Sequence, residues 1–193
     1  MPTLLVITGP IGAGKSTVSV LLGRRLSRAG QDAVVVDLDD VEFMQHTSTL
    51  EVGEWWDRGT EAHASLVAKW FALDVQIVVA HGPLVAVGEP GYDVGPLLRA
   101  VPSETEVSHA LLRVPFEVAL ERVGSDPDRT ATAISKDQNW LRGAHERFAA
   151  ALSQAPAFRW DIDTVGTTPS VIADRICVDL LADRPLSAEN ANQ

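Results

Sequence analysis

The feature that constrains this chain most is a glycine-rich segment, GPIGAGKST, at residues 9–17. It follows the apolar run TLLVIT at 3–8 and precedes the run VSVLLG at 18–23. The first run is continuous, which is typical of a parallel strand buried on both faces, whereas the apolar residues after the segment have helical spacing. The glycines therefore lie where a buried strand ends and a helix begins.

This segment matches the pattern GxxxxGK[ST] through Gly9, Gly14, Lys15 and Ser16. In such a loop, successive backbone N–H groups surround a phosphate chain, and glycines stand where a Cβ would block the approach or where φ is positive. The lysine places its charge on the β and γ phosphates, the hydroxyl can bind Mg²⁺, and the helix N-terminus adds partial positive charge. We therefore expect ATP with Mg²⁺ as cofactors, bound by Gly9, Gly12, Ala13, Gly14, Lys15, Ser16 and Thr17.

Strand-like and helix-like segments alternate along the rest of the chain. Further strands are predicted at 33–37, 75–80, 107–114 and 158–163. Strands separated by helices form a parallel sheet with right-handed crossovers. The sequence predicts a three-layer α/β domain, the P-loop NTPase fold, with a five-stranded parallel sheet and a short lid. This domain is expected to cover residues 1–183, and residues 184–193 are expected to be a disordered tail.

Two helix starts and one loop are predicted from local residue types. Thr60 can cap a helix, and Ser135 with Gln138 three residues later matches a capping box. Between the last two predicted strands, the polar segment 124–132 contains both glycine and proline. It is the predicted lid, because phosphoryl transfer needs water to be excluded and positive charge to be delivered.

Charge and hydropathy exclude several classes of partner. The chain has 26 acidic and 16 basic residues and a formal net charge of −10, opposite to that of most nucleic-acid and anionic-membrane binders. It has no run of 18 apolar residues and no basic segment before its first apolar run. We expect a cytoplasmic protein, monomer or homodimer, whose partner is a small molecule rather than a nucleic acid or a membrane.

The second predicted strand ends in a group of acids, VVVDLDDVE. If this segment is extended, alternation places Asp37 and Asp39 on one side, at the sheet edge where ligands bind. One carboxylate can then hold Mg²⁺ together with Ser16, and the other can take a proton from an acceptor hydroxyl. The same letters also fit a helix N-terminus rich in acids. Asp40 and Glu42 are expected at the surface.

Other nucleotide-binding classes fit less well. A GTPase would need an Asn-Lys-x-Asp segment, which is absent from the sequence, and a motor ATPase would need an acidic residue at the end of the third strand, which reads IVVAHGPL. His81 follows that strand into the expected crevice and is a candidate acceptor contact.

With these motifs the chain resembles the P-loop small-molecule kinases, the group that holds shikimate kinase, gluconate kinase and chloramphenicol phosphotransferase. The segment DLDDVE is similar to the Asp-x-Asp-x-x-Ile-Glu segment of shikimate kinase, which implies that Asp37 assists magnesium and Asp39 faces the acceptor hydroxyl. Similarity to the chloramphenicol enzyme implies instead that Asp37 is the base. The resemblance leaves both assignments open.

The same resemblance implies roles for residues further along. The segment 54–62 falls where these kinases bring aromatic and arginine side chains over the acceptor, which makes Trp55, Trp56 and Arg58 candidate substrate contacts. By position in the lid region, Arg122 would stack on adenine and Arg129 would reach the transferring phosphoryl group.

The segment expected to form the acceptor pocket, residues 38–100, is strongly acidic. It contains ten acidic residues and three basic ones. A kinase of nucleoside monophosphates grips a dianionic phosphate and needs several arginines. The sequence therefore favours phosphoryl transfer to a hydroxyl of a neutral or cationic acceptor, such as a natural product, an antibiotic or a sugar. The alternatives are a nucleoside or nucleotide kinase, or a regulatory module that hydrolyses ATP.

Overall fold

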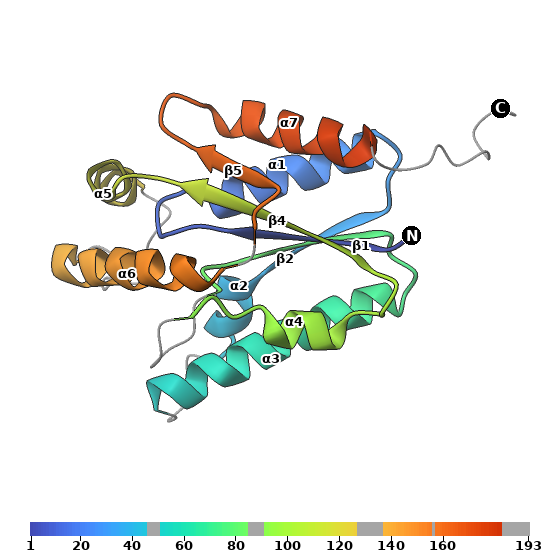
Figure 1. The fold of residues 1–193 in the computed structure, drawn as a ribbon, viewed down its shortest axis with the longest axis horizontal. Helices are drawn as coiled ribbons and strands as arrows, with labels where there is room; N and C mark the ends of the chain where they lie inside the picture. Colours follow the sequence, from blue (N-terminus) through green and yellow to red (C-terminus); the bar gives the residue numbers. More distant parts are fainter. Residues whose placement is uncertain (46–50, 85–90, 127–136, 156, 183–193) are drawn as a thin grey trace, which may run out of the picture.

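The computed structural model describes residues 1–45, 51–84, 91–126, 137–155 and 157–182. Its centre is a five-stranded sheet in the order β2-β3-β1-β4-β5, in which every neighbouring pair is parallel (Figure 1). The strands are β1 (Thr3–Thr8), β2 (Ala33–Asp37), β3 (Ile77–His81), β4 (Glu106–Arg113) and β5 (Trp160–Asp163). The predicted five-stranded parallel sheet is confirmed.

Helices cover both faces of this sheet. On one face α1 (Lys15–Arg28) packs beside α7 (Pro169–Ala182), and on the other lie α3 (Val52–Phe71) and α4 (Gly95–Ala100) (Figure 1). The other α-helices among the described residues are α2 (Leu38–Phe43), α5 (Phe116–Ser125) and α6 (Gln138–Ala151). The predicted three-layer α/β architecture is confirmed.

The apolar residues of β1 pack alternately on the two faces of the sheet. Leu5 and Ile7 pack into the cluster under α1 and α7, whereas Leu4 and Val6 pack into the cluster on the side of α3 and α4. All four side chains are fully buried. Because successive side chains of a strand point to opposite faces, only a strand covered on both faces needs a continuous apolar run.

The register of the strands brings the carboxyl ends of β1, β2 and β3 to one edge. Asp37 at the end of β2 is opposite His81 of β3, and His81 is opposite Ile7 of β1. The glycine-rich segment leaves β1 two residues after Ile7. Ligands of open α/β sheets bind at such an edge, so the edge is where a functional site is expected.

Both helix starts that were predicted from capping residues are wrong. Helix α3 begins at Val52, eight residues before Thr60, whose hydroxyl donates to the carbonyl of Asp57 inside the helix at 2.9 Å. Helix α6 begins after Asp137, whose carboxylate accepts from the N–H of Trp140 at 2.8 Å. Thr60 thus lies inside α3, and Asp137 is the N-cap of α6; Ser135 lies outside the described residues.

Most of the predicted lid and the whole predicted tail lie outside the residues that the structure describes. The predicted lid, 124–132, is described only as far as Asp126, so Arg129 is not described, and neither is the predicted tail. The described helices include none with the length and apolar character needed to cross a bilayer.

Candidate functional site

The glycine-rich segment after β1 forms a loop that turns back toward its own lysine. The Nζ of Lys15 donates to the carbonyl oxygens of Gly9 at 3.0 Å and Pro10 at 3.2 Å, and the N–H of Ala13 also donates to Pro10 at 3.2 Å. Lys15 is 8% exposed. The lysine charge is therefore held inside the turn of the loop, at the N-terminus of α1.

Two glycines fit the loop against its neighbours. Gly12 has φ +83°, and a Cβ built on it would lie 2.9 Å from both the Cα and the Cβ of Ala119 in α5. A Cβ on Gly9 would lie 2.5 Å from the carbonyl oxygen of Leu112 in β4. Since the obstructing atoms include backbone, a side chain at either position would push the loop away from the sheet and α5.

A cavity of about 340 Å³ opens beside this loop. Its size is within the range of small-molecule sites, and it lies at the carboxyl edge of the sheet. It is lined by Gly12, Ala13, Gly14, Lys15, Ser16, Thr17, Val18, Asp39, Arg122, Val123, Asp126, Thr164, Thr167, Pro169 and Ile172. Backbone amides, one lysine and one arginine at the wall of a cavity favour an anionic phosphate chain.

Arg122 is fixed at the wall of the cavity by carbonyl and hydroxyl acceptors. Its Nη1 donates to Thr164 Oγ1 at 2.9 Å and to the carbonyl of Gly12 at 3.2 Å, and its Nη2 donates to the carbonyl of Thr164 at 2.9 Å. The guanidinium thus links the glycine loop to the segment after β5. Its stacking on adenine stays a prediction.

Asp37 lies beside the loop serine. Its Oδ2 accepts from the hydroxyl of Ser16 at 3.3 Å, and its Oδ1 accepts from the N–H of Asp39 at 3.0 Å, because Asp37 is the N-cap of α2. Burial, together with the nearby Asp39 charge, raises the pKa of Asp37 to about 6. A nearby cation would therefore stabilise the charged carboxylate.

The extended conformation predicted for the segment that contains Asp37 and Asp39 is wrong. Asp39 is not extended but lies in the first turn of α2, so the two acids meet through an N-cap and not through strand alternation. Acids are favoured there by the helix dipole, which is why the second interpretation, an acidic helix N-terminus, holds. Asp39 nevertheless lines the cavity.

The pair Ser16 and Asp37 offers oxygen ligands suited to Mg²⁺. Among the residues that the structure describes, no three histidine, cysteine or carboxylate side chains come together as a metal site. Mg²⁺ commonly takes one or two protein oxygens and completes its shell with water and substrate phosphates. The residues fit a magnesium ion that arrives with a nucleotide.

His81, the last residue of β3, lies next to Asp37 of β2. It is 1% exposed, and its Nδ1 is 3.4 Å from Asp37 Oδ1. Burial, followed by the charge of Lys15, lowers the pKa of His81 to about 3, so the ring is neutral and the contact is not an ion pair. Its predicted contact with an acceptor is not tested by this geometry and stays a prediction.

Glu42 was expected at the surface, and this is wrong. It is 7% exposed, because α3 approaches α2 closely at Gly59, where an added Cβ would lie 2.9 Å from the Cγ of Glu42. Its Oε1 has no hydrogen-bond partner in the described part of the protein. Burial, followed by the charges of Asp39 and Asp37, raises the pKa of Glu42 to about 8.

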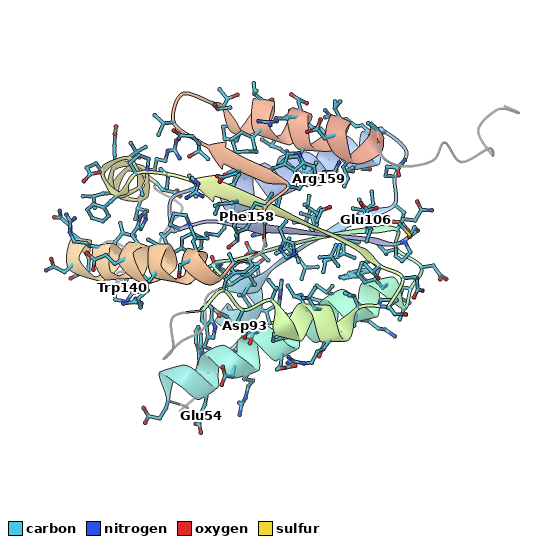
Figure 2. All side chains as sticks on the ribbon, viewed as in Figure 1. Glu54, Asp93, Glu106, Trp140, Phe158 and Arg159 are labelled. Carbon is cyan, nitrogen blue, oxygen red and sulfur yellow. The ribbon has the colours of Figure 1, made fainter. Side chains whose placement is uncertain are left out.

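The aromatic candidates lie in the first turns of α3. Trp56 packs against the apolar cluster on that face of the sheet, and the carbonyl of Trp55 accepts from the Nε2 of Gln45 at 3.2 Å. Arg58 is exposed. Figure 2 shows their neighbour Glu54 at the N-terminal end of α3, pointing away from the sheet. None of the three candidates is among the lining residues of the cavity, and their roles stay predictions.

Sequence reasoning missed the cavity residues that follow β5 and one histidine of α6. Thr164 lies 42 positions after Arg122, and the Nε2 of His145 is 2.9 Å from the carbonyl oxygen of Ile11, 134 positions earlier. Isolated threonines and histidines carry no local motif, so nothing in the sequence signals these contacts.

A side chain at Gly12 would be unfavourable for two reasons: the backbone there has a positive φ, and the added Cβ would clash with Ala119. This generates a first prediction. Gly12→Ala should weaken ATP binding at least about tenfold, since left-handed backbone alone costs about 1–2 kcal/mol in an L-residue. Gly30→Ala is the matched control, because Gly30 has φ +75° but nothing within 4 Å of its added Cβ. It should lower stability and leave ATP affinity unchanged. Calorimetric titration checks both variants, and equal ATP affinities for Gly12→Ala and the parent would contradict the prediction.

Glu42 generates a prediction about pH. The pKa of Glu42 is about 8 in the folded protein, whereas the ordinary pKa of a glutamate is 4.5, so between these values the folded state keeps a proton that the unfolded chain releases. The contribution of Glu42 to the free energy of unfolding is fully present below about pH 4.5 and is lost as the pH rises through about 8. Glu42→Gln should therefore stabilise the protein near pH 8 much more than near pH 5. Urea unfolding at both values measures this, and an equal effect at both would refute it.

Comparison with known proteins identifies the family. No family model matches the chain. A shikimate kinase of Saccharopolyspora erythraea is 30% identical over 200 aligned positions, which cover 98% of this chain and 100% of that protein. Among solved structures, the fold is shared with shikimate kinase from Acinetobacter baumannii in complex with shikimate (TM-score 0.58, 19% identity, 95% of this chain and 96% of that one).

The Deinococcus radiodurans tunicamycin resistance protein also shares the fold, with TM-score 0.61 and 16% identity over 93% of this chain and 96% of that one. These two structures share the fold with this chain, and the Saccharopolyspora relative covers 98% of its sequence. The chain belongs to the shikimate kinase family of P-loop kinases.

Proposed function

We propose that this ATP-dependent small-molecule kinase transfers the γ-phosphoryl group to a hydroxyl of a neutral or cationic acceptor, with Mg²⁺ as the metal. The observation that carries the proposal is the hydroxyl of Ser16 at 3.3 Å from the carboxylate of Asp37, directly beside the buried lysine of the glycine loop. This arrangement offers a metal-binding pair and a phosphate-binding loop at one sheet edge.

The residues of the loop would bind and orient the triphosphate. Lys15 would exchange its contacts with the carbonyls of Gly9 and Pro10 for the β and γ phosphates, and Ser16 with Asp37 would hold the metal. Bound Mg²⁺ neutralises charge on the phosphate oxygens. Because phosphoryl transfer is catalysed mostly by positioning and charge stabilisation, these groups would account for most of the chemistry that the protein must supply.

The base is proposed to be Asp39. Asp37 already accepts from Ser16 and from the N–H of Asp39, which suits a metal ligand, whereas Asp39 is a lining residue of the cavity. Asp39 would accept the proton of the acceptor hydroxyl while the oxygen attacks phosphorus and ADP leaves. Arg129 stabilising the transferring phosphoryl group and Arg122 stacking on adenine are proposed from the family resemblance.

The acceptor class is proposed from charge. Residues 38–100 carry ten acidic and three basic side chains, and Arg99 is paired with Glu61 at 2.9 Å. Trp55, Trp56, Arg58 and His81 remain the proposed acceptor contacts. A hydroxylated carboxylic acid such as shikimate is the second candidate, because the aligned relative is a shikimate kinase and Arg58 is exposed next to the proposed pocket residues of α3.

The remaining proposals concern the whole chain. Residues 1–183 are proposed to form the catalytic domain, with 184–193 as a tail, and the protein is proposed to act as a monomer or homodimer without nucleic acid. A nucleotide kinase would need more cations near the acceptor than this segment holds.

The acceptor class is tested by a panel assayed with ATP and Mg²⁺. Hydroxylated amines, sugars, antibiotics and shikimate are compared with nucleoside monophosphates by following ADP formation. Neutral or amine-bearing acceptors should be turned over with the highest kcat/KM. Turnover of shikimate alone would establish the second candidate, and turnover of nucleoside monophosphates alone would refute the charge argument.

Asp39→Asn tests the catalytic assignment. Loss of the base should lower kcat by about 10²–10⁴-fold and leave the Kd of ATP within about twofold of the parent. Asp40→Asn is the matched control, since Asp40 is the exposed neighbour in the same helix turn and should retain full activity. Full activity in Asp39→Asn would remove Asp39 from the mechanism and leave Asp37 as the base.

A further inference from the structure

We infer that His145 is a positioning residue for the phosphate loop: from α6 it holds the Ile11–Gly12 peptide so that the N–H of Gly12 faces the nucleotide. The inference rests on the proposed function, because it assumes that the loop binds a nucleotide. His145 belongs to no motif of the sequence.

The contact is short and links distant parts of the chain. The Nε2 of His145 lies 2.9 Å from the carbonyl oxygen of Ile11. A carbonyl oxygen can only accept, so Nε2 must carry the hydrogen, and it does so in one neutral tautomer as well as in the charged ring. His145 is therefore the donor of this hydrogen bond.

This contact fixes the direction of the following N–H. In a trans peptide the carbonyl and the next N–H point in opposite directions, so a carbonyl drawn toward α6 turns the N–H of Gly12 away from α6. Gly12 lines the cavity, whereas no residue of α6 does. The hydrogen bond from His145 thus orients a backbone donor toward the place where phosphate oxygens would lie.

The four carbonyls at the start of the loop are all held by donors. Lys15 holds those of Gly9 and Pro10, His145 holds that of Ile11, and Arg122 holds that of Gly12. If Lys15 turned to the phosphates, its contacts with the first two would be lost, and the carbonyl of Pro10 would keep the N–H of Ala13 at 3.2 Å. His145 and Arg122 would then keep the loop in its binding shape, so the loop would not have to reorganise when nucleotide binds.

The imidazole is itself held in place. Its ring meets that of Phe116 edge-to-face, with centroids 5.6 Å apart and an interplanar angle of 82°. The guanidinium of Arg142, also on α6, lies 4.1 Å from the centroid of the same phenyl ring. Arg142 therefore shares the α5–α6 packing of His145, while the carbonyl contact to the loop is made by His145.

Three variants separate the hydrogen bond from the packing. His145→Leu removes the donor, His145→Gln places an amide nitrogen near the position of Nε2, and Arg142→Leu disturbs the packing on Phe116 alone. Each is titrated calorimetrically with ADP and Mg²⁺, and with tripolyphosphate, which probes the phosphate loop without a base. The thermal shift caused by ADP is measured in parallel and compared with the unliganded protein.

His145→Leu should raise the Kd of both probes about tenfold and reduce the thermal shift, in line with one lost hydrogen bond and a displaced donor. His145→Gln should stay within about threefold of the parent, and Arg142→Leu should bind as the parent does. Unchanged binding in His145→Leu, or equal losses in His145→Leu and Arg142→Leu, would overturn the inference. If the parent protein itself bound neither ADP nor ATP, the proposed function would fail instead.

Discussion

The site depends on the direction of the peptide groups that follow β1. A phosphate chain can be held by backbone only if successive N–H groups face it, and then the carbonyls must find donors on the other side. In this protein those donors are Lys15, Arg122 and His145, which come from three different helices. The loop is thus shaped by tertiary contacts as well as by its glycines, and the packing of α5 and α6 becomes part of nucleotide binding.

The second determinant is the concentration of acids at the end of β2. Asp37 is partly buried and Glu42 is buried, both near the charge of Asp39. The pKa of Asp37 is raised to about 6 and that of Glu42 to about 8. Such a cluster disfavours the apo protein when all its members are charged, and it favours the entry of a cation. A magnesium ion arriving with ATP would relieve part of this repulsion at Asp37, which links the electrostatics of the site to its proposed cofactor.

The fold by itself does not select the acceptor. Proteins with this architecture include shikimate kinase and a tunicamycin resistance protein, whose names refer to unrelated small molecules. In this chain the segment between β2 and α4 is acidic and carries three tryptophans, so the proposed acceptor is a hydroxylated compound without several negative charges.

The sequence alone determined the fold class, the strands and the phosphate loop, because each depends on contiguous residues: a doubly buried strand needs an unbroken apolar run, and the loop needs glycines at fixed spacing. It also predicted Asp37 and Asp39 as site residues, and the structure places Asp37 beside Ser16 and Asp39 at the cavity, although in a helical and not an extended segment. Only the tertiary structure decided that α3 begins before Thr60, that Glu42 is buried against Gly59, and that His145 reaches Ile11. These features depend on how segments that are distant in the sequence pack against each other. The spacing of residues within one segment does not specify such packing.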